Sequence, residues 1–188
     1  MRSRCGAKSV RREAGLSRPG LAVIAVLALM PPAFALAADG ACPVHLFVIE
    51  RSKNANIVVY DAKRGPTGDF DSAEPVVAYW LLNGEADKRE ELTKIEQDRA
   101  YGVETTAGNT AGTYSMVFKA QRKRQFTVRV LNGCPVVTVP IGGHDAILRK
   151  LFIKSKETLV LPKIAYVEFF GEDAQTGKAL EEKFKPAN

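Results

Sequence analysis

Histidine, cysteine and the sequence patterns of known catalytic sites are scarce in this chain. Its 188 residues include two histidines and three cysteines. Any histidine-based acid–base or zinc site is therefore limited to His45, His144 and carboxylates. The chain also lacks the Gly-x-Ser-x-Gly, Ser-x-x-Lys, His-Glu-x-x-His and Cys-x-x-Cys patterns. The sequence motifs therefore identify no catalytic residue, no metal site and no cofactor.

The sequence also lacks an apolar run long enough for a membrane-spanning helix, which needs about 20 residues. Leu21–Met30 is an uninterrupted apolar run of ten residues that follows a basic segment and stops at Pro31. Small residues then stand at Ala35 and Ala37, as in a signal peptidase site. We expect residues 1–37 to be a signal peptide cleaved before Ala38, with Ala33-Phe34-Ala35 as the alternative site. The mature domain, 38–188, is then periplasmic or secreted and has no transmembrane anchor.

An excess of positive charge is missing from the mature domain. The chain has 27 basic and 21 acidic residues, but six of the basic residues and one acidic residue lie in 1–37. The remainder holds 21 basic and 20 acidic residues, a net charge of +1. A general attraction to polyanions thereby loses its basis, and we expect no nucleic acid partner.

Two cysteines remain after signal cleavage. Cys5 leaves with the signal peptide, so Cys42 and Cys134 enter an oxidising compartment together. Two thiols of a small exported domain usually pair. We expect a Cys42–Cys134 disulfide.

Short apolar runs separated by turn residues dominate the mature chain, a pattern typical of antiparallel strands. Asn132-Gly133 between two such runs is a strong hairpin signal. The tips of two further hairpins are expected at 51–56 and 121–124, the second as a basic tip, Arg122-Lys123-Arg124. The expected strands are 44–49, 57–60, 76–82, 114–120, 125–131, 134–139, 147–154, 159–161, 164–170 and 179–184.

One segment favours a helix. Asp87 is the expected N-cap and Glu90 its capping-box partner, with the helix ending near Arg99. Its apolar face is thin, which predicts a surface position. The chain is thus expected to be mostly β, an antiparallel barrel or a two-sheet sandwich of about 9–10 strands with one short surface helix.

Several motifs are better explained by structure than by chemistry. Asp69, Asp71 and Glu74 could offer oxygen ligands to Ca²⁺, but their spacing does not fit an EF-hand and a solvated acidic loop explains them. The segment 171–178 departs from the phosphate-binding loop pattern in the spacing of its glycines. We interpret it as a hairpin connection.

Polar residues at the end of the first hairpin, joined by residues at the end of the expected helix, form the expected ligand site. Guanidinium, ammonium and amide donors there suit a carboxylate or phosphate. The expected ligand-binding residues are Arg51, Lys53, Asn54, Arg99 and Tyr101. If the two arginines are partly buried, we expect Glu50, Asp61 or Asp98 to neutralise them.

The segment 50–61, together with Tyr79-Trp80, residues 100–103 and residues 170–178, resembles a bacterial exported family designated domain of unknown function 4833. The resemblance covers nearly the whole mature chain. It implies an exported, β-rich domain and carries no activity, cofactor or catalytic residue.

Two main functional hypotheses follow, beside a third class, a structural subunit that would dock through an exposed apolar patch. The first is a non-catalytic, periplasmic or secreted domain that binds an anionic small molecule or is associated with an envelope component. The alternative is a small envelope hydrolase or lyase with His45 or His144 as base and Arg51 or Arg99 as anion holder. The two differ in whether a histidine lies near either arginine.

Overall fold

The computed structural model describes residues 42–156 and 163–186. These residues belong to a single compact unit, 39–188. The predicted signal peptide and the predicted strand 159–161 lie outside the described residues. Apart from a 3-10 turn at Leu82–Gly84 and the six-residue helix α1, Lys94–Arg99, the described elements are strands.

The strands are β1 (Phe47–Arg51), β2 (Asn54–Ala62), β3 (Val76–Leu81), β4 (Arg89–Glu91), β5 (Val103–Ala107), β6 (Tyr114–Phe118), β7 (Gln121–Leu131), β8 (Cys134–Ile141), β9 (His144–Lys156), β10 (Lys163–Asp173) and β11 (Ala179–Phe184).

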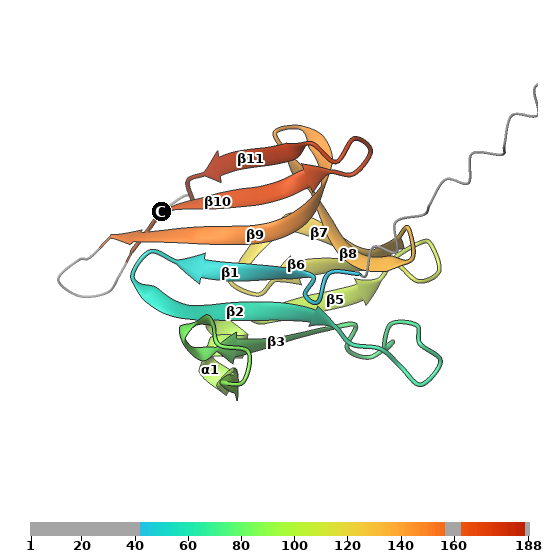
Figure 1. Ribbon diagram of the computed structural model, residues 1–188, viewed down its shortest axis with the longest axis horizontal. Helices are drawn as coiled ribbons and strands as arrows, with labels where there is room; N and C mark the ends of the chain where they lie inside the picture. Colours follow the sequence, from blue (N-terminus) through green and yellow to red (C-terminus); the bar gives the residue numbers. More distant parts are fainter. Residues whose placement is uncertain (1–41, 157–162, 187–188) are drawn as a thin grey trace, which may run out of the picture. The chain divides into compact units, whose positions relative to one another are not determined.

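All eleven described strands form one sheet curled into a half-barrel (Figure 1). Its branch point is β9. Ile147 pairs with Thr138 of β8 on one side and with Glu172 of β10 on the other, and further along β9 Leu151 pairs with Ile49 of β1 and with Phe169 of β10. One edge of β9 is therefore shared by β8 and β1, while β10 occupies the other edge. We call β1–β4 the first wing and β5–β8 the second wing.

The β class predicted from the sequence is confirmed, and the architecture lies between the two that were expected. A single branched sheet curls over its own core instead of closing as a barrel or separating into two sheets. The pairing of β1 with β9 is parallel, whereas the other strand pairs of the described sheet are antiparallel. Parallel pairing needs a long connection, and the other strands of both wings supply it here.

The core lies between the two wings. Phe47 of β1 stacks on Tyr60 of β2 with ring centroids 4.3 Å apart, and Phe118 of β6 meets both rings edge-on at 6.2 and 5.7 Å. Phe126 continues the cluster, 5.3 Å from Phe118. Full burial of one such side chain is worth about 1.5–3 kcal/mol. Aromatic contacts thus join wings that share no hydrogen bonds along their strands.

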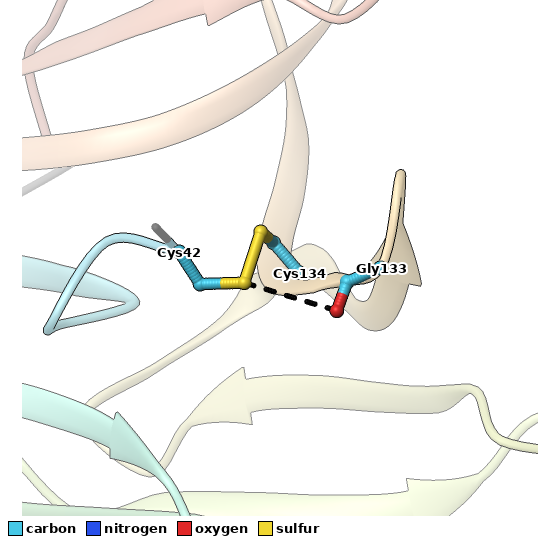
Figure 2. The surroundings of a disulfide bond; sticks show 3 residues. All are labelled: Cys42, Gly133 and Cys134. Carbon is cyan, nitrogen blue, oxygen red and sulfur yellow. Dashed lines mark hydrogen bonds between the residues drawn. A yellow bond between two sulfur atoms is a disulfide. The ribbon is translucent and has the colours of Figure 1, made fainter. Parts of the chain in front are cut away.

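The predicted disulfide is confirmed. Cys42, ahead of β1, is bonded to Cys134 at the start of β8, with Cα atoms 5.2 Å apart (Figure 2). Figure 2 also shows Cys42 Sγ near the carbonyl oxygen of Gly133, at 3.8 Å. Asn132 and Gly133 have φ of 52° and 81°, as their predicted hairpin turn requires. The bond therefore ties the first wing to the second.

The helix is shorter than predicted and begins later. Its N-cap is Thr93, whose side chain accepts from the Glu96 backbone N–H while the Glu96 carboxylate accepts from the Thr93 N–H. The predicted capping residues, Asp87 and Glu90, lie before it, because residues 89–91 pair with β3 as strand β4. The free edge of β3 pairs with residues 89–91 and so prevents a helix from starting there. The helix therefore begins at the capping box of Thr93 and Glu96.

The first predicted hairpin tip is too long, and the second is misplaced. Ser52 and Lys53 alone form the first turn, so Asn54 belongs to β2 and pairs with Arg51. In the second hairpin the turn is Lys119-Ala120. The expected basic tip, residues 122–124, is therefore part of β7, where strand pairing satisfies the backbone. The short strands β4 and β5 were not predicted.

Candidate functional site

A partly open cavity of about 260 Å³ lies where the ends of β1, β9, β10 and β11 meet the turn between β6 and β7. Its lining is dominated by apolar side chains. Ile164, at the start of β10, lines the cavity and is 47% exposed, which places the mouth there. The lining residues are Ile49, Ala100, Tyr101, Phe118, Ala120, Gln121, Arg124, Phe126, Leu151, Ile153, Ile164, Val167, Phe169, Phe184 and Pro186.

Strand alternation explains the apolar walls. Phe47 and Ile49 are buried on the inner face of β1, and Leu151 and Ile153 line the cavity from β9. Successive side chains of a strand point to opposite faces, so residues two apart share a wall. Because the wings diverge toward this end of β9, the core side chains do not fill the space between them.

Arg124 forms part of the wall. It lies on the inner side of β7, and its guanidinium stands 3.9 Å from the centroid of the Phe169 ring. Its Nη1 donates to Glu182 of β11 over 2.8 Å, and it also donates to the Pro140 carbonyl oxygen. Hydrogen bonds from Arg124 hold the pKa of Glu182 below its usual range against the opposing effect of burial. The charge of Arg124 is therefore neutralised within the protein.

Arg51 lies beside the cavity in an aromatic setting. Its guanidinium carbon is 4.8 Å from the centroid of the Trp80 ring and 5.7 Å from that of Tyr101. Its Nε is buried and has no hydrogen-bond partner among the described residues. Arg51 thus reaches the cavity wall through Tyr101, which lines it.

Glu96 is the carboxylate associated with this cluster. The indole N–H of Trp80 donates to Glu96 Oε1 over 3.2 Å. Burial alone would raise the pKa of Glu96, but hydrogen bonds from Thr93 and Trp80 and the charge of Arg51 hold it below its usual range. Burial raises the pKa of Tyr101, and the Arg51 charge opposes that rise.

Tyr101 is positioned by tight packing behind α1. A Cβ on Gly102 would stand 1.8 Å from the carbonyl oxygen of Gln97, so glycine alone fits there. The Tyr101 backbone carbonyl accepts from the buried Tyr60 hydroxyl over 2.6 Å. The chain leaving the helix is thereby held against the core, and the Tyr101 ring meets that of Trp80 edge-on at 5.1 Å.

Of the five predicted ligand-binding residues, the structure brings Arg51 and Tyr101 together. Asn54 is the strand partner of Arg51, and its Oδ1 accepts from the Asn56 N–H. Lys53 is in the turn beside them. Arg99 is exposed at the end of α1. Whether these residues bind a ligand stays a prediction.

The carboxylate near Arg51 is not one of the three that were expected from the sequence. Glu50 pairs with Lys150 at 3.2 Å, Asp98 with Lys94 and Lys119, and Asp61 lies 2.7 Å from His45. None of these three carboxylates forms a described ion pair with Arg51. Glu96 is the carboxylate that acts on it, and the sequence offered no signal for this because the predicted helix placed Glu96 in mid-helix instead of at its first turn.

Both histidines lie away from Arg51. His45 lies 2.7 Å from Asp61 of β2, and Asp61 is roughly 20 Å of strand from Asn54, the β2 partner of Arg51. His144 opens β9, roughly 30 Å of strand from Ile153, the β9 partner of Arg51. His144 is 62% exposed and stands 3.4 Å from Asp173. The described geometry brings neither histidine to Arg51, the first of the two predicted anion holders.

The acidic loop that could suggest calcium is held by its own contacts. Asp71 accepts from the backbone N–H groups of Ala73 and Glu74, and Lys63 donates to Glu74 over 2.6 Å. Across residues 42–156 and 163–186, no group of three or more histidine, cysteine or acidic side chains is arranged to hold a metal ion. Within the same residues, no helix has the length and apolar character to span a membrane.

Comparison with known proteins leads to a family without an assigned activity. No curated protein and no solved structure matches the chain. A family model does match, over residues 47–183, which include every described strand except the last residue of β11. The chain belongs to the family described as domain of unknown function (DUF4833).

Proposed function

We propose that this chain is an exported, non-catalytic binding domain and that its ligand is a small molecule with an apolar part held in the cavity. The observation that carries the proposal is the cavity itself, a space of about 260 Å³ lined mainly by aliphatic and aromatic side chains. Binding sites for small molecules are concave and mostly apolar, with a few polar groups that set orientation. Gln121 and Tyr101 are polar groups of this kind here.

The size of the cavity limits the ligand. An apolar cavity of about 150 Å³ is large enough to bind benzene. The larger space here suits an alkyl chain or a fused aromatic system, whereas a strongly hydrated sugar would lose water on entry without finding enough hydrogen-bond partners. The proposed ligand therefore differs from the anionic small molecule or envelope component expected from the sequence, because it has an apolar part.

Export is supported by the disulfide and by the first 37 residues. Disulfides persist in oxidising compartments and are rare in the cytosol, and Cys42 is paired with Cys134. The basic and apolar pattern of 1–37 has the form of a signal peptide. A periplasmic or secreted location agrees with both.

The hydrolase or lyase alternative finds less support. Its base was to be His45 or His144, and its anion holder Arg51 or Arg99. Asp61, which holds His45, and His144 lie roughly 20 and 30 Å of strand from the strand partners of Arg51, far beyond the reach of shared proton transfer. The non-catalytic proposal is therefore preferred.

The test uses the uncharged fluorescent probe N-phenyl-1-naphthylamine with the purified domain. We expect saturable binding with one probe per protein. Ala120 is an exposed turn residue at the cavity, so Ala120→Trp should cover the opening and weaken binding at least about tenfold, the loss of roughly 1.4 kcal/mol.

The matched control is Ala107→Trp, at an exposed alanine that ends β5 away from the cavity. It should bind the probe as the wild type does, and circular dichroism establishes that both variants are folded. Absence of saturable binding to the wild type, or equal binding by the two variants, would remove the cavity as the site.

A further inference from the structure

We propose that Arg51 binds the head group of the molecule in the cavity, so that the site selects an apolar chain ending in an oxyanion. The ligand is then an amphipathic anion, either a carboxylate or a phosphate ester of an apolar chain. This inference rests on the proposed function, because it assigns the head group of the ligand that the cavity holds.

The Arg51 side chain has a donor that the described residues leave unsatisfied. Its Nε is buried without a hydrogen-bond partner among the described residues, and the large majority of buried polar groups in proteins have one. The Trp80 and Tyr101 rings flank the guanidinium at 4.8 and 5.7 Å. Rings hold a guanidinium by its face and leave its N–H edge for an acceptor. The cluster thus presents a positioned donor.

Arg124, the other guanidinium near the cavity, differs from Arg51 in its partners. Arg124 is committed to both carboxylate oxygens of Glu182, at 2.8 and 3.2 Å. Of the two, Arg51 is the guanidinium that no described ion pair occupies, and the nearby Glu96, whose pKa its charge lowers, directs Oε1 to the Trp80 indole N–H and Oε2 to Thr93 instead.

Arg51 lies next to residues that line the cavity. Arg51 contacts the ring of Tyr101, which lines the cavity. Its strand neighbour Ile153 and the residue two before it, Ile49, also line the cavity. A chain lying on these apolar side chains can place its terminal group at the end of β1. Carboxylate and phosphate both accept paired hydrogen bonds from a guanidinium fork.

The experiment compares four ligands with the same ten-carbon chain and different head groups. They are decanoate, decyl phosphate, 1-decanol and decyltrimethylammonium, each titrated below its micelle-forming concentration by calorimetry. We expect decanoate or decyl phosphate to bind at least about tenfold more tightly than 1-decanol, as the gain of a charge-assisted hydrogen bond implies. The arm that binds more tightly distinguishes a fatty acid from a phosphate-headed lipid.

Trp80 supplies an independent readout because it is the single tryptophan of the chain. Its ring contacts Arg51, so the anion should shift its emission more than the alcohol does. Arg51→Gln should reduce the preference for the anion to less than about threefold and leave 1-decanol binding in place. If Arg51→Gln does not fold, Arg51→Lys replaces it, and the loss of the fork geometry should still lower the preference.

The matched control is Arg64→Gln. Arg64 also lies over an aromatic ring, 5.7 Å from the Phe70 centroid, but in the loop after β2 and away from the cavity. Its variant should keep the wild-type preference. Equal affinity of the wild type for anion and alcohol, or an unchanged preference in both Arg51 variants, overturns the inference while alcohol binding keeps the proposed function. Binding of none of the four ligands overturns both.

Discussion

At the scale of single residues, Gly102 controls the approach of the cavity wall to the helix. After α1 the chain passes so close to the carbonyl oxygen of Gln97 that no side chain fits at position 102. The same short segment supplies Tyr101, which meets Arg51, Trp80 and the cavity at once. Gly102, which has no side chain, therefore determines the position of the Tyr101 ring in the candidate site.

Gly102→Ala should lower the free energy of unfolding by about 1–3 kcal/mol, the range for overpacked sites, because backbone atoms must move to admit the methyl group. Urea denaturation measures the change. Gly65→Ala is the control, since its Cβ would meet nothing closer than 3.9 Å and its stability should change by less than about 0.5 kcal/mol. Equal stability of the two variants would show that the packing behind α1 can relax.

The meeting of Arg51 and Tyr101 is the part of the candidate site that was predicted from the sequence. Both were predicted to lie at one end of the β scaffold, since each follows the end of an element, and they do meet. Trp80 and Glu96 were not predicted as their neighbours. Their part depends on how α1 and β3 pack, and no local pattern in the sequence specifies that packing.

At the scale of elements, the helix start illustrates competition between two local signals. Asp87 with Glu90 and Thr93 with Glu96 both have capping-box spacing, and the structure uses the second pair. Pairing of residues 89–91 with β3 excludes the first. Hydrogen bonds to β3, the strand just before this segment, decided the outcome. The capping signal within residues 87–99 gives no information about that pairing.

Thr93→Ala should therefore destabilise the domain by about 1 kcal/mol, the usual cost of losing an N-cap, whereas Asp87→Ala should have little effect. Thermal unfolding followed by circular dichroism distinguishes the two. The reverse ranking would mean that the helix in solution begins at the earlier signal. Because Glu96 also accepts from Trp80, loss of the cap should in addition perturb Trp80 fluorescence.

Hairpins were predicted more reliably than the helix. The apolar runs on either side of the Asn132-Gly133 turn predicted the hairpin of β7 and β8, and their pairing is confirmed. The basic run 122–124 was mistaken for a turn because charge suggests exposure. Arg124 instead points inward, because it pairs with Glu182 and lies over the Phe169 ring. Those partners are on β11 and β10, near the C-terminal end of the chain.

At the scale of the whole domain, the disulfide and β9 connect the same two wings. Cys42–Cys134 joins the segment before β1 to β8, and β9 pairs with β1 and β8 along one edge. The cavity was not predictable from sequence because it arises where these wings diverge. It is a property of the branched sheet and of no single element.

Replacing both cysteines, Cys42→Ser with Cys134→Ser, should lower the free energy of unfolding by about 4 kcal/mol, mainly by releasing a long loop in the unfolded chain. Urea denaturation gives the value. Wild-type protein unfolded in a reducing agent should match the double variant, which separates the effect of the bond from that of the serines. An unchanged urea midpoint would contradict the proposed role of the bond.

The shared edge of β9 also has a consequence for the order of events during synthesis. Strand β1 emerges early, yet its parallel partner on β9 follows about a hundred residues later. Contacts this distant in sequence slow folding, because the chain loses loop entropy before the contact forms. Early oxidation of Cys42 and Cys134 would shorten the remaining search, since β8 leads directly into β9. The timing of thiol oxidation thus bears on how long the apolar inner face of β1 stays uncovered.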